Sequence, residues 1–316
     1  MSRKISNTQL FALPAPPAAE IRVGGVAYRL LRVFKHDFFA ATAMYEAIGS
    51  TGSLPVWVSP VAPSGTTSVP LVDSCGMPSA SGTGETPVPP VIPKIVVKTY
   101  RAQPFFGLAM DWLGRFSREH EKAIYEALEG AAGVPRFLGC VGPTGLAVEY
   151  IDAVPLDHLD KPPAGYFDRM RQILDAVHAR GVAYVDANKL SNMLVSHDGS
   201  AHLIDFQIAI RRRDDWPWPM RAIAASLVRY LQGKDIYHLC KQKRRLAPDE
   251  LTDEEEKISR RRGMWHRLHR KITKPYRAVR RDFLRRRYRA GKMESPSAEL
   301  EDHHQPEKQT WRAEKQ

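Results

Sequence analysis

The stretch from Val182 to Gln207 decides how this 316-residue chain is interpreted. It begins Val182-Ala183-Tyr184-Val185-Asp186-Ala187-Asn188-Lys189-Leu190-Ser191-Asn192-Met193-Leu194-Val195 and, after the turn phrase His197-Asp198-Gly199-Ser200, ends Leu203-Ile204-Asp205-Phe206-Gln207. The pattern predicts a loop that bears Asp186 and Lys189, an Asn192 that opens a short strand, and a second apolar strand that leads to Asp205. Asn192 and Asp205 are therefore expected at adjacent strand ends.

These residue types suit phosphoryl transfer. A carboxylate must orient the attacking hydroxyl and accept its proton, and Asp186 lies on a suitable loop. Mg²⁺ prefers hard oxygen ligands, which Asn192 and Asp205 supply. A cation must also meet the transferring phosphate, and Lys189 is three residues from the candidate base.

The stretch resembles the catalytic loop and the metal-binding segment of the protein-kinase-like superfamily. The resemblance covers about Ile21 to Phe206, outside one insertion, and is closest to bacterial RIO-like and lipopolysaccharide-core (heptose/Kdo) kinases. The phrases Arg118-Glu119 and Gly133-Val134-Pro135-Arg136 are similar to phrases of those kinases. The resemblance implies an α+β chain with the two-lobed protein-kinase-like fold, with a small β-rich N-lobe and a helical C-lobe.

The resemblance also implies a nucleotide site for ATP with Mg²⁺. Lys98, which ends the apolar run Ile95-Val96-Val97, is similar to the strand lysine that holds the α- and β-phosphates. Glu121 on the following helix would be its ion-pair partner, with Glu119 as the fallback. The backbone from Glu149 to Ile151 would hold the adenine base.

Four departures from the family pattern stand out. Tyr184 occupies the usual place of the catalytic-loop histidine, and the step from Asp186 to Asn192 is one residue longer than in protein kinases. Gln207 replaces the glycine of the metal-binding segment. There is no glycine-rich phosphate loop, so the equivalent hairpin is 33–40, where Lys35 is the candidate phosphate contact.

The periodicity and turn residues predict the elements around these motifs. Strands are expected at 26–33, 40–45, 95–100, 145–151, 192–195 and 202–208. Helices are expected at 113–130, at 167–180 where Gly181 ends the helix, and from Trp218 to about Arg289 with interruptions at Pro248 and Pro275. Strands followed by helices describe an α+β arrangement.

Composition divides the chain further. Residues 50–93 contain 27 Pro, Gly, Ser and Thr residues and no Lys or Arg, which predicts a disordered insertion in the N-lobe. The expected organisation is an N-terminal arm at 1–20, an N-lobe at 21–151, a C-lobe at 152–292 and a disordered tail at 293–316. The insertion has no catalytic group, so we expect it to be dispensable for ATP binding.

The positive charge is concentrated near the C-terminus. The whole chain has a formal net charge of +12, but residues 260–292 alone contain 15 basic residues against the single acid Asp282. Three interpretations remain open: an amphipathic helix on an anionic membrane, a groove for a phosphorylated sugar or nucleic acid, or a C-lobe helix with solvated arginines. Of the acidic partners, nucleic acid is the least favoured.

Other features exclude several classes of protein. The three cysteines, Cys75, Cys140 and Cys240, are far apart, which argues against a disulfide framework or a zinc cluster. The N-terminus shows no signal peptide, and no run of 18 apolar residues occurs. We therefore expect a cytoplasmic protein, with peripheral contact at the inner membrane face as one of the alternatives above.

The sequence thus predicts a kinase that transfers the γ-phosphate of Mg-ATP to a hydroxyl group. The resemblance and the basic flank favour a sugar hydroxyl on a glycolipid of the lipopolysaccharide type. No Ala-Pro-Glu element follows Phe206, which argues against a peptide acceptor, but a RIO-like Ser/Thr protein kinase remains an alternative. A catalytically silent scaffold for acidic partners is the alternative of another class.

Overall fold

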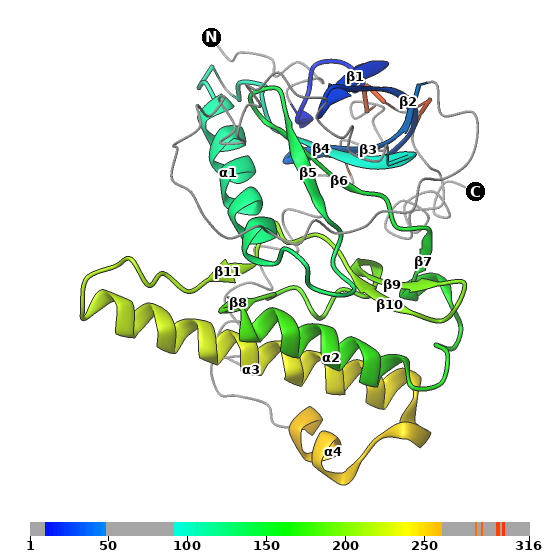
Figure 1. Ribbon diagram of the computed structural model, residues 1–316, viewed down its shortest axis with the longest axis vertical. Coiled ribbons are helices and arrows are strands. Elements are labelled where there is room, and N and C mark those ends of the chain that lie inside the picture. Colours follow the sequence, from blue (N-terminus) through cyan, green and yellow to red (C-terminus); the bar gives the residue numbers. More distant parts are fainter. Residues whose placement is uncertain are drawn as a thin grey trace, which may run out of the picture. The chain divides into compact units, whose positions relative to one another are not determined.

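The computed structural model describes residues 10–48, 92–105, 107–260, 282, 286, 295–297, 299 and 300. They fall into two compact units. The β-rich unit holds the described residues up to Arg115, Leu138–Tyr150 and the described residues from Ser295 on; the helical unit holds Phe116–Phe137 and the described residues from Ile151 to Arg286. Figure 1 shows the elements of both units.

The β-rich unit is built on a six-stranded sheet in the order β1-β2-β3-β4-β6-β5. Its neighbours from β1 to β4, and β4 with β6, pair antiparallel. Gly24 and Gly25 join β1 to β2 with φ values of 56° and 82°, the left-handed pair that a two-residue hairpin turn requires. The strands are β1 (Glu20–Val23), β2 (Val26–His36), β3 (Ala40–Ala47), β4 (Lys94–Tyr100), β5 (Phe137–Val141) and β6 (Gly145–Glu149).

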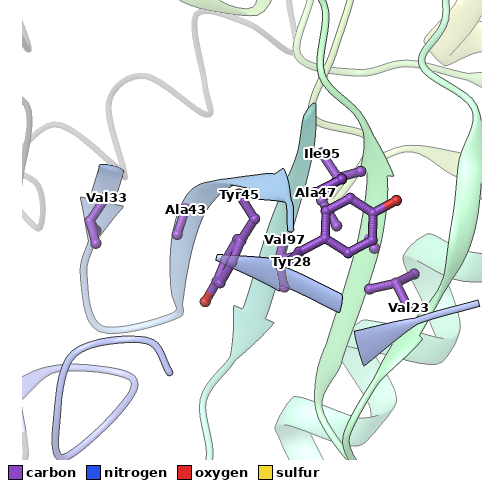
Figure 2. Close-up of a cluster of buried hydrophobic side chains, with 9 residues drawn as sticks. Val23, Tyr28, Val33, Ala43, Tyr45, Ala47, Ile95 and Val97 are labelled. Atoms are coloured by element: carbon purple, nitrogen blue, oxygen red, sulfur yellow. The ribbon is translucent and has the colours of Figure 1, made fainter. Parts of the chain in front are cut away.

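One face of this sheet carries the core of the unit. Val97 on β4 lies opposite Ala43 on β3 and opposite Ala147 on β6, and all three are buried. Because successive side chains of a strand point to opposite faces, Lys98 projects from the other face. Figure 2 draws the cluster, which consists of Val23, Tyr28, Val33, Ala43, Tyr45, Ala47, Ile95, Val97 and Ala147.

Within the described residues, the helical unit contains most of α1, three further helices and two small sheets, ordered β10-β9-β7 and β11-β8. Helix α1 starts in the β-rich unit and belongs to the helical unit from Phe116 on. Short 3-10 helices span Leu156–His158, Leu190–Asn192 and Pro248–Glu250. The remaining elements are α1 (Asp111–Ala127), β7 (Ala153–Pro155), α2 (Tyr166–Ala179), β8 (Val182–Ala183), β9 (Met193–Ser196), β10 (Ala201–Leu203), β11 (Ile210–Arg211), α3 (Met220–Leu246) and α4 (Asp253–Arg260).

The helices are held together by an apolar face and by ion pairs around one buried lysine. The face of α2 that includes Met170, Leu174 and Val177 is fully buried, as its helical spacing predicts. Lys243 of α3 is buried and its Nζ lies 2.7 Å from Asp168 of α2 and 3.0 Å from Glu255 of α4. A buried ammonium group requires such partners, so these ion pairs fix three helices together.

These observations confirm the predicted α+β arrangement, an N-terminal antiparallel sheet followed by helices. The expected strands and the helices near 113–130 and 167–180 are present with shifted ends. The expectations missed β1, β5 and the short strands β7, β8 and β11. The strand expected at 202–208 ends at Leu203, before the chain turns at Asp205. The insertion, the basic segment 260–292 and the tail lie almost wholly outside the described residues.

Within the described ranges, no helix is both long enough and apolar enough to cross a lipid bilayer.

Four buried tyrosines predict that the protein loses stability in alkaline solution. Burial raises the pKa of Tyr28, Tyr166 and Tyr184, and raises that of Tyr45 to about 12. In the unfolded chain these phenols ionise near pH 10, while in the folded protein they stay protonated. The unfolded state therefore binds fewer protons above about pH 10, and the free energy of unfolding falls there. Urea midpoints measured from pH 8 to pH 11 should decrease steadily above that point. A flat profile would contradict the burial of these phenols.

Candidate active site

The predicted catalytic loop forms a compact turn between β8 and β9. The backbone N–H of Lys189 donates to the carbonyl of Asp186 at 3.0 Å, and the N–H of Asn192 donates to the carbonyl of Lys189 at 3.2 Å. The side-chain Nδ2 of Asn192 also donates to Oδ2 of Asp186 at 3.0 Å. The loop thus brings the candidate base and the first candidate metal ligand into direct contact.

The segment after β10 completes this group. The N–H of Ile204 donates to the carbonyl of Asn192 at 3.0 Å, which sets Asp205 beside the loop. Nζ of Lys189 lies 3.8 Å from Oδ2 of Asp205. The structure therefore brings together four of the residues singled out from the sequence: Asp186, Lys189, Asn192 and Asp205.

The oxygen atoms of this group fit a magnesium ion bound with a nucleotide. Since Asn192 uses its Nδ2 to donate to Asp186, its amide oxygen is the atom suited to a cation. Mg²⁺ is usually held by one or two protein oxygens together with phosphate oxygens and water. The described residues contain no cluster of three or more His, Cys, Asp or Glu side chains that could hold a metal alone. Asn192 and Asp205 would therefore share the ion with phosphate.

The loop backbone is strained next to the candidate base. Val185 has a φ of 73°, which a β-branched residue rarely adopts, and Asp205 has a φ of 63°. Such conformations cost of order 1–3 kcal/mol each and persist only where the surroundings enforce them.

Asp235 of α3 enforces this conformation. Its carboxylate accepts the backbone N–H of Tyr184 through Oδ2 and that of Val185 through Oδ1, both at 2.8 Å. Asp235 is fully buried, and Nε2 of His178 on α2 lies 3.0 Å from its Oδ2. No motif in the sequence points to Asp235.

Two further α3 side chains reach the same loop. Nε2 of Gln232 donates to the carbonyls of His178 and Val182 at 3.0 and 3.1 Å. About two turns past Asp235, Nε2 of Gln242 donates to the carbonyl of Asn188 at 3.0 Å. Helix α3 therefore supports the loop on both sides of Asp186.

Tyr184, which stands where the resemblance implies a histidine, connects the candidate catalytic loop to the segment that carries Asp205. Its hydroxyl donates to the carbonyl of Ile204 at 2.6 Å, so it joins the loop to the residue before Asp205. Its ring packs edge-on against Phe206, with centroids 5.2 Å apart, and Phe206 packs in the same way on Tyr125 of α1 at 5.4 Å. Burial, with added repulsion from the Asp205 carboxylate, raises the pKa of Tyr184 well above its usual value. Tyr184 therefore acts as a neutral structural brace.

Glu121 and Glu119 occupy different environments on α1. Glu121 is buried, and its Oε1 accepts the backbone N–H of Phe206 at 3.2 Å. Glu119 is half-exposed and pairs with its neighbour Arg118. Of the two candidates, Glu121 is the one in contact with the segment that carries Asp205, the candidate metal ligand. Lys98 belongs to the β-rich unit, so an ion pair between Lys98 and Glu121 is a prediction.

Lys98 and Lys35 lie on the same face of the β-rich sheet. Thr42 on β3 is opposite Lys35 on β2 and also opposite Lys98 on β4. The three residues form one row, in which the two lysines are separated by two strand spacings, about 10 Å. Both ammonium groups are therefore suited to contact one polyphosphate.

The hairpin that contains Lys35 differs from a glycine-rich phosphate loop. Oδ1 of Asp37 accepts the backbone N–H groups of Phe39 and Ala40 at 2.8 and 3.0 Å. Lys35 forms an ion pair with Asp37 at 2.6 Å. Burial opposes ionisation of Asp37, but Lys35 and these N–H donors outweigh it and lower its pKa. A carboxylate thus takes the N–H groups that a glycine-rich turn would offer to phosphate.

The segment expected to hold adenine, Glu149 to Ile151, coincides with the point where the chain leaves the β-rich unit. Glu149 is the last residue of β6 and lies opposite Ile95. The N–H of Tyr150 donates to the carbonyl of Lys94 at 3.3 Å, and the helical unit resumes at Ile151.

A cavity of about 390 Å³ in the β-rich unit lies away from these residues. It is lined by the N-terminal segment Leu13–Ala18 and by Tyr45, Val97 and Thr99. Val97 and Thr99 project from the face opposite to Lys98, so we do not assign this cavity to the nucleotide.

Comparison with solved structures gives 622 matching chains. One of them is the Rio2 kinase from Chaetomium thermophilum, with a TM-score of 0.38 and 16% sequence identity over 52% of this chain. The match spans 56% of that kinase chain. No protein-family model and no curated protein matches the sequence. The roles given to residues here therefore rest on contacts within this chain.

Proposed function

We propose that the chain is an ATP-dependent phosphotransferase that moves the γ-phosphate of Mg-ATP to a hydroxyl group. The observation that carries this proposal is the meeting of Asp186, Lys189, Asn192 and Asp205 at one loop that α3 holds in a strained conformation. A carboxylate, a cation and two oxygen ligands are the groups that phosphoryl transfer needs.

Each residue has a distinct part in this reaction. Asp186 orients the acceptor hydroxyl and takes its proton, and Lys189 stabilises the charge that develops on the transferred phosphoryl group. Asn192 and Asp205 would hold the magnesium ion, and that ion would neutralise negative charge on the phosphate oxygens. In the β-rich unit, Lys98 and Lys35 bind phosphates, and the backbone from Glu149 to Ile151 binds adenine. Glu121 orients Lys98 in the same proposal.

A glycolipid sugar is the proposed acceptor. Between Phe206 and the start of α3 at Met220 the only regular element is the short strand β11, which pairs with β8. So short a segment offers little surface on which to dock an extended peptide, which favours a small hydroxyl acceptor over a protein.

The first experiment separates the acceptor classes. Purified protein is incubated with γ-labelled ATP, Mg²⁺ and lysate, and label is measured in the lipid, protein and small-molecule fractions. Asp205→Asn should remove the label because it weakens the metal site. Asp160→Asn, the same change at an exposed position, should leave it unaltered.

The fraction that gains label decides between the candidates. Label in glycolipid that disappears with Asp205→Asn supports the proposal. Label in protein supports the RIO-like Ser/Thr kinase. A third result is that the wild-type protein binds ATP and yet labels no fraction more than Asp205→Asn does. In that case the proposal is wrong, and the scaffold for acidic partners replaces it.

A further inference from the structure

The N-terminal half of α3 carries an apolar surface that faces solvent. Met220, Ile223, Leu227 and Tyr230 are 49% to 68% exposed. Their spacing of three, four and three residues places them on one side of the helix, and we call them the α3 stripe. Large apolar side chains grouped in this way usually mark a contact surface, whereas scattered ones do not.

The stripe is exposed because α2 covers a different part of α3. The side chains of α3 that form hydrogen bonds or ion pairs with α2 include Gln232, Asp235 and Lys243. Figure 1 shows the first turns of α3 extending past the end of α2. Five of the six buried residues of α3 lie in the half that supports the catalytic loop, from Asp235 on, and the other half presents the stripe.

Aromatic and cationic residues surround the stripe. Trp216 and Trp218, just before α3, are 39% and 76% exposed. From Arg211 to Lys234 there are six Lys and Arg residues against two acids, Asp214 and Asp215, which pair with Arg212 and Arg213. Nζ of Lys234 lies 5.1 Å from the ring centroid of Tyr230, so its aliphatic stem follows the stripe.

We infer that the α3 stripe and its flanking residues dock on an anionic lipid bilayer. A helix that carries apolar residues on one side and cations around it lies in the membrane interface, and tryptophan and tyrosine prefer that interface. Lys and Arg add attraction to anionic lipid headgroups. The stripe is about 15 Å long, enough to lie flat on the surface.

Docking through α3 would set the catalytic loop at a fixed distance from the bilayer. The same helix holds Tyr184 and Val185 through Asp235, two turns beyond Leu227. A lipid-anchored hydroxyl could then reach Asp186 without the protein leaving the surface. The docking inference stands without the proposed activity, because lipid binding needs neither ATP nor transfer.

Vesicle flotation of the full chain tests the inference without ATP. Vesicles of phosphatidylcholine with about one-third phosphatidylglycerol should bind the protein more tightly than phosphatidylcholine alone. The double variant Ile223→Ser with Leu227→Ser should bind the anionic vesicles at least about tenfold more weakly than the wild type. The reason is that it removes two apolar side chains that the membrane would bury. The matched control, Leu108→Ser with Trp112→Ser, changes two residues that are also exposed and should bind as the wild type does.

Several results would overturn the inference. These are equal binding of the double variant and the wild type, no preference for anionic vesicles, and no binding at all. Sedimentation velocity provides a further check, since self-association that is lost in the double variant would show that a second copy covers the stripe. Thermal unfolding of both variants should match the wild type, because all four positions are exposed.

Discussion

Asp186→Asn should reduce phosphoryl transfer by about 10²- to 10⁴-fold while the protein remains folded and binds ATP. The amide keeps the size of the carboxylate, and its oxygen can still accept Nδ2 of Asn192. What is lost is the group that accepts the proton from the attacking hydroxyl, and general base catalysis contributes rate factors of that order. Initial rates at saturating ATP, with the KM for ATP measured in parallel, test this expectation.

The control for this variant is Asp160→Asn, which removes the same charge at an exposed site. Its rate should stay within about twofold of the wild type, since a distant surface charge is screened by solvent. If Asp186→Asn keeps more than a tenth of the wild-type rate, Asp186 is not the base. A large increase in the KM for ATP would instead place Asp186 in nucleotide binding.

The grouping of the candidate catalytic residues could be predicted from the sequence because these residues are close together along the chain. Asp186, Lys189 and Asn192 lie within seven residues, and Asp205 follows after one hairpin. A short hairpin brings its two ends together whatever the rest of the fold does. The local sequence pattern was therefore sufficient to predict that Asp205 lies near Asn192. The four side chains accordingly meet in the structure.

Helical periodicity could also separate the two glutamates of α1. Ile124, Tyr125 and Leu128 follow Glu121 at positions three, four and seven, so Glu121 lies on the apolar side of the helix. It is buried against the N–H of Phe206, while Glu119 stays half-exposed.

Asp235 could not be predicted in this way. Its partners Tyr184 and Val185 are about 50 residues away, and a single aspartate between Lys234 and Ile236 looks like a solvated helix residue. Only the packing of α3 against the loop shows that the carboxylate is buried. The same holds for Asp37, whose contact with the hairpin N–H groups depends on the turn geometry.

Asp235→Asn should lower the free energy of unfolding by about 3 kcal/mol and reduce the rate of transfer by at least about tenfold. Both carboxylate oxygens accept hydrogen bonds, so the amide replaces one acceptor with a donor that faces a buried N–H. An unsatisfied buried group of this kind costs about 1–3 kcal/mol. The hydrogen bond that remains is also weaker, because its acceptor is a neutral amide oxygen and no longer a charged carboxylate. Urea unfolding measures the loss of stability.

A readout of rate distinguishes positioning of the loop from stability alone. At a temperature where Asp235→Asn is fully folded, kcat should fall by at least about tenfold while the KM for ATP changes little, because a small displacement of Asp186 suffices to lose rate. His178→Gln is the control. This variant alters one contact to Asp235 and leaves both hydrogen bonds from the backbone N–H groups of Tyr184 and Val185. It should therefore lower the free energy of unfolding by about 1 kcal/mol or less.

The strain at Val185 provides a second test of the same arrangement. Glycine adopts a φ of 73° without steric cost, so Val185→Gly in the Asp235→Asn background relieves the conformation that the carboxylate enforces. We expect the double variant to recover about 1 kcal/mol of stability and part of the lost rate. In the wild-type background the same change should gain less rate, because Asp235 already holds the loop. Equal unfolding and equal turnover of Asp235→Asn and the wild type would show that the loop does not depend on α3.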